Sequence, residues 1–178
     1  MSGSALRWTI RVIKVTLEGQ ASSELPASTD WRSTMHIAEI LRSKGSDVHT
    51  VAPDRTVRDL VAFLKQHNIG AVIVSPGDGQ IAGIVSERDV VRRLAEGVDV
   101  LDDPVTAIMT AESELHTCTS DSGVDELMQL MTEHRIRHIP VLDDDGRLAG
   151  IVSIGDVVKS RIGELQFERD ELEHYVTG

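Results

Sequence analysis

Two short stretches of the chain combine a serine and an aspartate at a spacing suited to a ligand that carries phosphate and sugar. They are GIVSERD at residues 83–89 and GIVSIGD at residues 150–156. In each stretch the serine stands where an apolar run passes into a helical pattern, so backbone N–H groups of the first helical turn are left to bind an anion. Asp89 and Asp156 can each accept two hydrogen bonds from a vicinal diol, such as the edge of a ribose.

The same spacing has a second interpretation that involves no ligand. A serine with an acidic residue three positions later resembles a capping box, which only satisfies N–H groups at the start of a helix. A single copy of the motif would favour that interpretation. Because the whole seven-residue frame occurs twice in a matching context, we expect Ser86, Asp89, Ser153 and Asp156 to bind a ligand.

The repetition extends well beyond these motifs. Residues 37–94 align without a gap with residues 104–161, at a constant spacing of 67 residues, and 19 of the 58 aligned pairs are identical. A fixed period of this kind indicates two copies of one structural unit. One copy alone has too little core to be stable, so we expect the two copies to pack face to face as a pseudo-symmetric pair.

Each copy has the pattern of a β-α-β-β-α unit, which predicts the α/β (α+β) fold class. Short β-branched runs indicate strands, and apolar residues three and four positions apart indicate amphipathic helices. The first copy is predicted to contain strand 48–51, helix 56–67, strand 71–74, strand 81–85 and helix 87–96. The second is predicted to contain strand 115–118, helix 123–134, strand 138–142, strand 148–152 and a helix from Ile154 to about Tyr175. The stretches 76–79 and 143–146 are hairpin-type turns.

The last helix carries a stripe of mostly apolar side chains spaced alternately four and three residues apart. The stripe comprises Val158, Ile162, Leu165, Arg169, Leu172 and Val176. Such heptad-like spacing favours a contact with a second copy of the chain, although a helix packed on its own domain has the same pattern. We predict a weakly ordered N-terminal extension at 1–34, domains at 35–101 and 102–162, and a helical extension that contributes to a homodimer at 163–178.

The two units, each ending in Gly, two apolar residues, Ser, two variable residues and Asp, resemble a pair of CBS domains, or Bateman module. The resemblance covers residues 36–162 and is closest to small stand-alone bacterial CBS-pair proteins. It implies a homodimer that binds AMP or another adenosine-containing nucleotide, including NAD. It also implies that Ser86 and Ser153 contact phosphate, that Asp89 and Asp156 hold the ribose, and that adenine lies between aliphatic side chains.

A basic stretch in the second copy makes the two predicted clefts unequal. The family often carries a base that reaches phosphate before the x-Pro of this strand, and Arg137 and His138 match that position. The first copy has no base there, while Arg88 can supplement the pair and has Gly155 as its counterpart. The predicted nucleotide-binding residues are therefore Ser86, Arg88, Asp89, Ile136, Arg137, His138, Ser153 and Asp156.

Charge and cysteine content argue against several other classes of protein. The net charge is −11, and the residues beyond position 34 carry −12, so the chain repels nucleic-acid backbones. No apolar run approaches the roughly 18 residues of a membrane helix. The single cysteine, Cys118, leaves no disulfide framework and fits a reducing cytoplasm.

Nothing in the sequence indicates catalysis. Neither a nucleophile–base pair nor a Walker loop is visible, and Asp143–Asp145, His49 and His116 have the character of solvated surface groups rather than metal ligands. We predict a sensor that is not an enzyme and needs no metal. It binds an adenine nucleotide, AMP first with NAD and ATP as the other candidates, and acts on an unidentified partner protein. The alternative is a CBS-pair dimerisation scaffold without physiological nucleotide binding.

Overall fold

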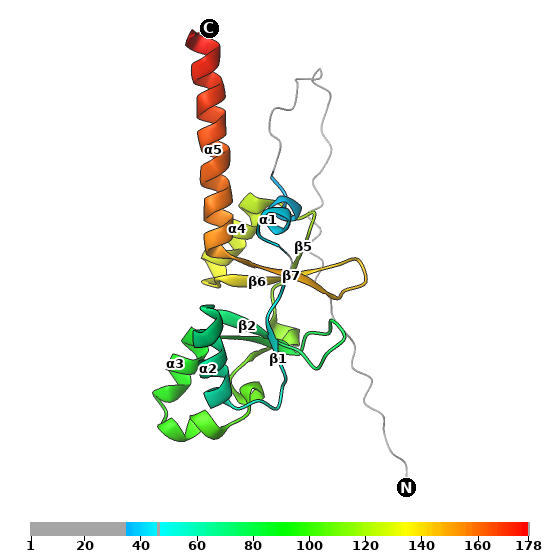
Figure 1. Ribbon diagram of the computed structural model, residues 1–178, viewed down its shortest axis with the longest axis vertical. Coiled ribbons are helices and arrows are strands. Elements are labelled where there is room, and N and C mark those ends of the chain that lie inside the picture. Colours follow the sequence, from blue (N-terminus) through cyan, green and yellow to red (C-terminus); the bar gives the residue numbers. More distant parts are fainter. Residues whose placement is uncertain (1–34, 46, 178) are drawn as a thin grey trace. The chain divides into compact units, whose positions relative to one another are not determined.

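The computed structural model describes residues 35–45 and 47–177, so the predicted extension at 1–34 lies outside the described residues. Figure 1 shows the arrangement of the helices and strands. In chain order they are α1 (Ile37–Lys44), β1 (Thr50–Val51), α2 (Val57–His67), β2 (Ala71–Val74), β3 (Gly83–Ser86), α3 (Glu87–Leu94), β4 (Thr110–Ala111), β5 (Cys118–Thr119), α4 (Val124–His134), β6 (His138–Leu142), β7 (Leu148–Ser153) and α5 (Ile154–Thr177). Short 3-10 helices cover Val98–Asp102 (η1), Val105–Ala107 (η2) and Glu112–Glu114 (η3).

Two small sheets confirm the mixed α/β fold and the duplicated β-α-β-β-α unit. The first sheet has the strand order β1-β2-β3-β4 and the second has the order β5-β6-β7. The strands on either side of α2, β1 and β2, pair in parallel, and so do the strands on either side of α4, β5 and β6. The next strand of each sheet, β3 or β7, is antiparallel to its neighbour. The registers also match: Val72 pairs with Val85, and Ile139 pairs with Val152, 67 residues further along.

The helices α2 and α4 show how local sequence positions the following strands. Both bury one apolar stripe, and both end in a residue in the left-handed conformation, Asn68 (φ 51°) and Arg135 (φ 55°). In α2 the hydroxyl of Thr56 accepts a hydrogen bond from the N–H of Asp59, 3.1 Å away, which caps the start of the helix. The left-handed residue then turns the chain back toward the sheet.

Several element boundaries differ from the prediction. The strands predicted at 48–51 and 115–118 are shorter, Thr50–Val51 and Cys118–Thr119, because only these residues pair with the neighbouring strand. Helix α3 ends at Leu94, two residues before the predicted end. The structure also contains α1, η1–η3 and β4, none of which the sequence pattern identified.

The first residues of each repeat, 37–44 and 104–111, here called the entry segments, are exchanged between the two hydrophobic cores. Ile37 and Ile40 of α1 pack with the buried residues of the second repeat, such as Met131. Val105 and Ile108 pack in the core of the first repeat. Figure 1 shows α1 beside α4, far along the chain from it. The predicted boundaries 35–101 and 102–162 follow the sequence repeat and stay predictions, since packing crosses them in both directions.

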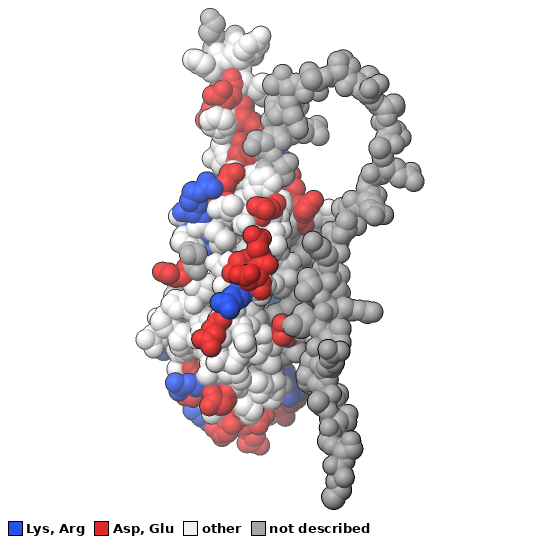
Figure 2. Space-filling view, turned by 90° about the vertical axis from the view of Figure 1, so that its right-hand side faces the viewer, with Lys and Arg blue, Asp and Glu red and all other residues white. Residues whose placement is uncertain are grey.

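Acidic side chains are prominent on the described surface. On the face shown in Figure 2, Asp and Glu side chains are spread widely and only a few Lys and Arg side chains lie between them. This distribution agrees with the net charge of −11. A phosphate ligand therefore needs basic groups in its immediate vicinity.

Candidate functional site

Both serine–aspartate motifs form the same hydrogen-bonded loop at a junction between strand and helix. At the end of β3, the N–H and the hydroxyl of Ser86 donate to Oδ2 of Asp89 over 2.9 and 2.6 Å. At the end of β7, the N–H and the hydroxyl of Ser153 both donate to Oδ2 of Asp156 over 2.8 Å. The N–H of Asp156 donates in return to Oγ of Ser153 over 3.2 Å.

The capping interpretation therefore describes the hydrogen bonds within both motifs. It leaves room for the binding interpretation, because each loop uses only Oδ2 of the carboxylate. Within the described part of the chain, Oδ1 of Asp89 and Oδ1 of Asp156 accept no hydrogen bond. The loops hold each carboxylate in place, and Oδ1 keeps lone pairs that can accept further hydrogen bonds.

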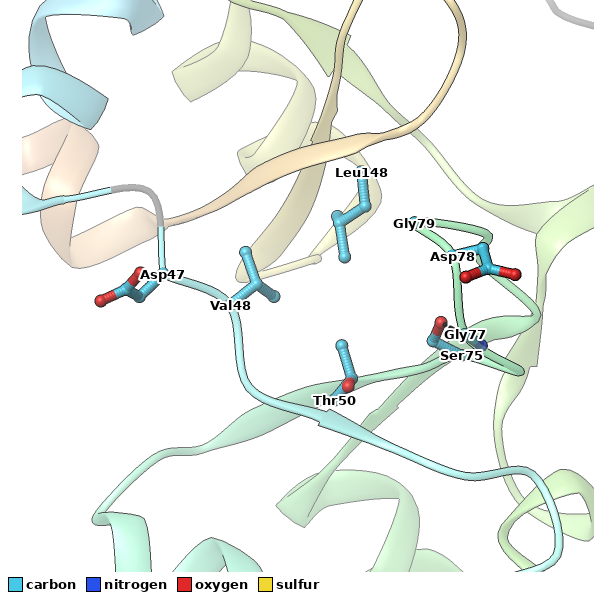
Figure 3. A pocket seen from close by; sticks show the side chains of 8 residues that line it. All are labelled: Asp47, Val48, Thr50, Ser75, Gly77, Asp78, Gly79 and Leu148. Atoms are coloured by element: carbon cyan, nitrogen blue, oxygen red, sulfur yellow. Dashed lines mark hydrogen bonds between the residues drawn. The ribbon is translucent and has the colours of Figure 1, made fainter.

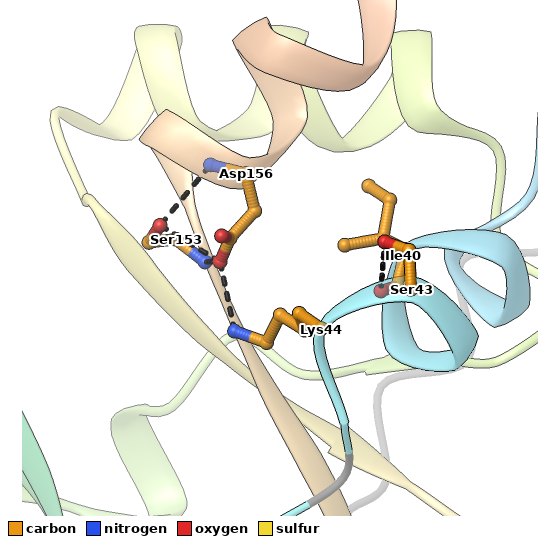
Figure 4. Close-up of polar contacts among 5 residues, drawn as sticks. All are labelled: Ile40, Ser43, Lys44, Ser153 and Asp156. Carbon is orange, nitrogen blue, oxygen red and sulfur yellow. Dashed lines mark hydrogen bonds and ion pairs between the residues drawn. The ribbon is translucent and has the colours of Figure 1, made fainter.

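A lysine that the sequence analysis did not consider contacts the second motif. Nζ of Lys44, the last residue of α1, donates to Oδ2 of Asp156 over 2.8 Å (Figure 4). The side chains are about one third exposed, 30% for Lys44 and 28% for Asp156. Burial by itself raises the pKa of Asp156, but the hydrogen bonds from Lys44 and Ser153 outweigh it and hold the pKa below its ordinary value.

His138 adjoins the same motif. It is the first residue of β6 and pairs with Ser153 in the sheet register. Burial lowers the pKa of His138 most, the charge of Arg137 lowers it further, and Asp156 acts in the opposite direction. The imidazole is therefore largely neutral at pH 7, and it can exchange hydrogen bonds without adding a fixed charge.

The two repeats meet beside this histidine. A Cβ placed on Gly70 would lie 3.5 Å from Oε2 of Glu87 and 3.7 Å from Cε1 of His138. Glu87 opens the first motif helix, and His138 belongs to the second repeat. Groups from both repeats therefore border one region, as the face-to-face prediction requires.

Arg88, Ile136 and Arg137, the other predicted binding residues, differ in their contacts and in their exposure to solvent. Nη1 of Arg88 donates to the backbone carbonyl of Arg135 over 3.1 Å, so Arg88 bridges the two repeats. Ile136 is partly buried and packs against the core of the second repeat. Arg137 is exposed, and its backbone carbonyl accepts a hydrogen bond from Ile154 over 2.9 Å. The structure thus gathers His138, Ser153 and Asp156 around one motif, while Arg88 contacts the opposite repeat.

A separate pocket of about 320 Å³ also lies between the repeats, as Figure 3 shows. Its lining residues are Asp47, Val48, Thr50, Ser75, Gly77, Asp78, Gly79 and Leu148. Leu148 belongs to the second repeat, and its N–H donates to the carbonyl of Gly79 over 3.0 Å. None of the predicted nucleotide-binding residues lines this pocket, so it is distinct from the two motifs.

The described residues form neither a cluster of metal-binding side chains nor a membrane-spanning helix. Over 35–45 and 47–177, no three His, Cys, Asp or Glu side chains are clustered so as to hold a metal ion. Among the described helices none combines the length and apolar character needed to cross a bilayer. Cys118 is buried, and this burial raises the pKa of its thiol to about 12, so the thiolate that would react is suppressed.

Comparison with known proteins gives matches across both repeats. Residues 37–96 and 105–163 match the CBS domain family. The mitochondrial CBS domain-containing protein CBSX3 of Arabidopsis thaliana is 42% identical over 149 residues, which cover 80% of this chain and 72% of that protein. A CBS-domain containing protein of Agrobacterium tumefaciens has a TM-score of 0.68 at 44% identity, over 71% of this chain and 99% of that chain. A CBS domain protein of Pyrobaculum aerophilum, complexed with AMP, has a TM-score of 0.61 at 27% identity, over 68% of this chain and 89% of that chain.

Proposed function

Because the chain belongs to the CBS domain family and carries two copies of the domain, we propose that it is a regulatory module that binds an adenine nucleotide, AMP or an NAD-like dinucleotide. In this proposal Ser86, Asp89, Ser153 and Asp156 hold phosphate and ribose. The module catalyses no reaction of its own and acts in the cytoplasm on a partner protein.

The observation that carries the proposal is the duplicated carboxylate geometry. Each motif aspartate is fixed through Oδ2 by the serine before it, so its orientation is set before a ligand arrives. A preorganised acceptor loses little conformational entropy on binding, and a ribose diol can donate to the remaining oxygen. The AMP complex of the Pyrobaculum protein supports the same class of ligand.

The contacts between the repeats support a regulatory role. Arg88 reaches the carbonyl of Arg135, and Gly79 accepts from Leu148, so polar contacts join the repeats in addition to the exchanged apolar segments. A nucleotide that bridges groups of both repeats favours one arrangement of the pair over others. The surface presented to a partner then depends on the concentration of the nucleotide.

A panel of ligands tests this proposal by thermal unfolding. AMP, ADP, ATP, NAD and S-adenosylmethionine are compared with CMP as the control for nonspecific phosphate binding. A nucleotide at about 100 times its Kd stabilises the folded state by about 2.7 kcal/mol. For a chain of this length that raises the melting temperature by roughly 5–10 °C. Phosphorus NMR of the same samples should recover the nucleotides unchanged, whereas turnover would contradict the absence of catalysis.

The dimerisation scaffold is a second candidate, and the outward face of α5 favours it. Val158, Ile162, Leu165 and Leu172 are 41%, 51%, 48% and 67% exposed, although all four are apolar. Their heptad-like spacing suits a second copy of the same helix. If no adenine nucleotide in the panel raises the melting temperature more than CMP does, the scaffold is favoured over the sensor.

The dimer has its own test by sedimentation velocity. We expect a homodimer that Leu165→Glu or Leu172→Glu dissociates, because a carboxylate would be buried in an apolar contact. Phe167→Glu is the matched control, since Phe167 is 67% exposed on the same helix but outside the stripe. A dimer unaffected by the two leucine substitutions would show that other surfaces hold the copies together.

A further inference from the structure

Lys44 is fixed with respect to the second motif by the packing of α1. Ile37 and Ile40 of this helix are 0% and 5% exposed in the core of the second repeat. Leu41 lies directly against the glycine that begins the motif, because a Cβ placed on Gly150 would be 2.8 Å from Cδ2 of Leu41. Helix α1 ends at Lys44, so the lysine stem starts beside the motif and reaches Asp156 without any rearrangement of the backbone.

The contact between Lys44 and Asp156 occupies the oxygen that the capping loop also uses. Oδ2 of Asp156 accepts from Nζ of Lys44 and from both the N–H and the hydroxyl of Ser153, each over 2.8 Å. In this state the ammonium neutralises the carboxylate (Figure 4). A ribose that approaches Asp156 must share this carboxylate with Lys44.

The first motif has no such cation. The residue 67 positions after Lys44 is Ala111, which lies in β4 and pairs with Gly83 through the backbone. Within the described residues, Asp89 accepts hydrogen bonds from Ser86 alone. Among the described residues, the exchange of the entry segments between the repeats therefore places an ammonium group, that of Lys44, at the second motif and none at the first.

The effect of Lys44 on binding depends on whether the ligand carries an anionic group that can pair with the lysine. An uncharged nucleoside that draws the Asp156 carboxylate toward its hydroxyls weakens the pair with Lys44 and offers no anion in exchange. A nucleotide brings its own phosphate, which Lys44 can reach on its flexible four-carbon stem. Burial and the charge of Arg137 lower the pKa of His138, so at neutral pH its imidazole carries less positive charge than the ammonium of Lys44.

We propose that Lys44 is a specificity-determining residue of the second site, where it selects phosphate-bearing nucleosides over uncharged ones. This inference rests on the proposed function. It names the ligand class of one site, and it distinguishes that site from the one at Ser86 and Asp89.

Titration calorimetry with AMP and adenosine tests the role of Lys44. Loss of a hydrogen bond between charged groups costs about 10- to 100-fold in affinity. Lys44→Met should therefore weaken AMP binding by about that factor and leave adenosine binding unchanged or tighter. Lys44→Arg, which keeps the charge, should retain the preference for AMP. Lys65→Met, on the exposed face of α2 in the first repeat, is the control and should change neither affinity.

The outcomes separate the two proposals. If the unsubstituted protein binds none of the adenine nucleotides in the panel, the proposed function fails, and the role of Lys44 fails with it; if it binds another of them but not AMP, the role of Lys44 alone is overturned. If AMP binds equally well to the wild type and to Lys44→Met, the role of Lys44 alone is overturned. An equal loss of AMP and adenosine affinity would also overturn it, because a purely structural lysine has that effect. Melting temperatures of all the variants establish that they are folded.

Discussion

The glycines that begin the two motifs should respond very differently to the same substitution. A Cβ on Gly83 would lie 2.3 Å from the backbone carbonyl oxygen of Thr110 and 2.9 Å from Sδ of Met109. A Cβ on Gly150 would lie 2.8 Å from Cδ2 of Leu41, which is the end of a side chain. The first clash can be relieved only by moving β4 away from β3, whereas the second needs only a rotation of Leu41.

The expected magnitudes follow from this difference. Overpacking costs about 1–3 kcal/mol. Gly83→Ala should therefore lower the free energy of unfolding by about 3 kcal/mol, and Gly150→Ala should lower it by about 1 kcal/mol. The smaller entropy of the unfolded chain with alanine stabilises both variants by about 0.4–1 kcal/mol and cancels in the comparison. At roughly 2–4 °C per kcal/mol, the two melting temperatures should differ by roughly 4–8 °C.

Urea denaturation measures both free energies of unfolding directly. Gly163→Ala is the control, because a Cβ at that position in α5 would meet no described atom within 4 Å apart from its chain neighbours and the backbone of its own helix. It should stabilise the protein by up to about 1 kcal/mol, since alanine is the better helix former. Equal losses for Gly83→Ala and Gly150→Ala, or a larger loss for Gly150→Ala, would refute the packing argument.

Two further predictions concern pH and ligand charge. The pKa of His138 in the folded protein lies below the ordinary value of 6.5, which applies to the unfolded chain. The neutral histidine's contribution to the free energy of unfolding is therefore complete above pH 6.5 and is lost as the pH falls from 6.5 through the pKa of the folded state. His138→Gln should therefore make the urea stability less dependent on pH between about 7.5 and 5.5, whereas His174→Gln on exposed α5 should not; identical profiles would refute this. Because the described body is acidic, AMP should bind at least as tightly as ATP at physiological salt, where screening acts over about 8–10 Å. Calorimetry in which ATP is preferred more than about tenfold would contradict that charge argument.

The sequence predicted the parts of the fold that depend on local patterns. Helices α2 and α4 were located to within one residue because the spacing of their apolar residues is a local signal. The repeat of 67 residues predicted two copies of one unit, and the matching registers of the two sheets agree with it. Strand β4 escaped prediction, because two residues, Thr110 and Ala111, give no detectable alternation.

The candidate site was predicted only in part, and the missing part is long-range. The serine–aspartate loops were recognised because their residues are three positions apart. Lys44 was missed because it is 112 residues from Asp156, and its helix packs on the opposite repeat. Arg88 stays a predicted phosphate group, and its hydrogen bond to the carbonyl of Arg135 was not anticipated because the two residues are 47 positions apart.

Calorimetric titration of AMP into the wild type, Asp156→Ala and Asp89→Ala tests the central claim most directly. If the second site binds the nucleotide, the wild type binds AMP and Asp156→Ala loses about 10- to 100-fold in affinity. Both variants should remain folded, because loss of a helix cap costs only about 0.5–2 kcal/mol. Loss of affinity in Asp89→Ala alone would move the site to the first motif. AMP affinity that neither substitution changes would contradict the claim and leave both motifs as helix caps.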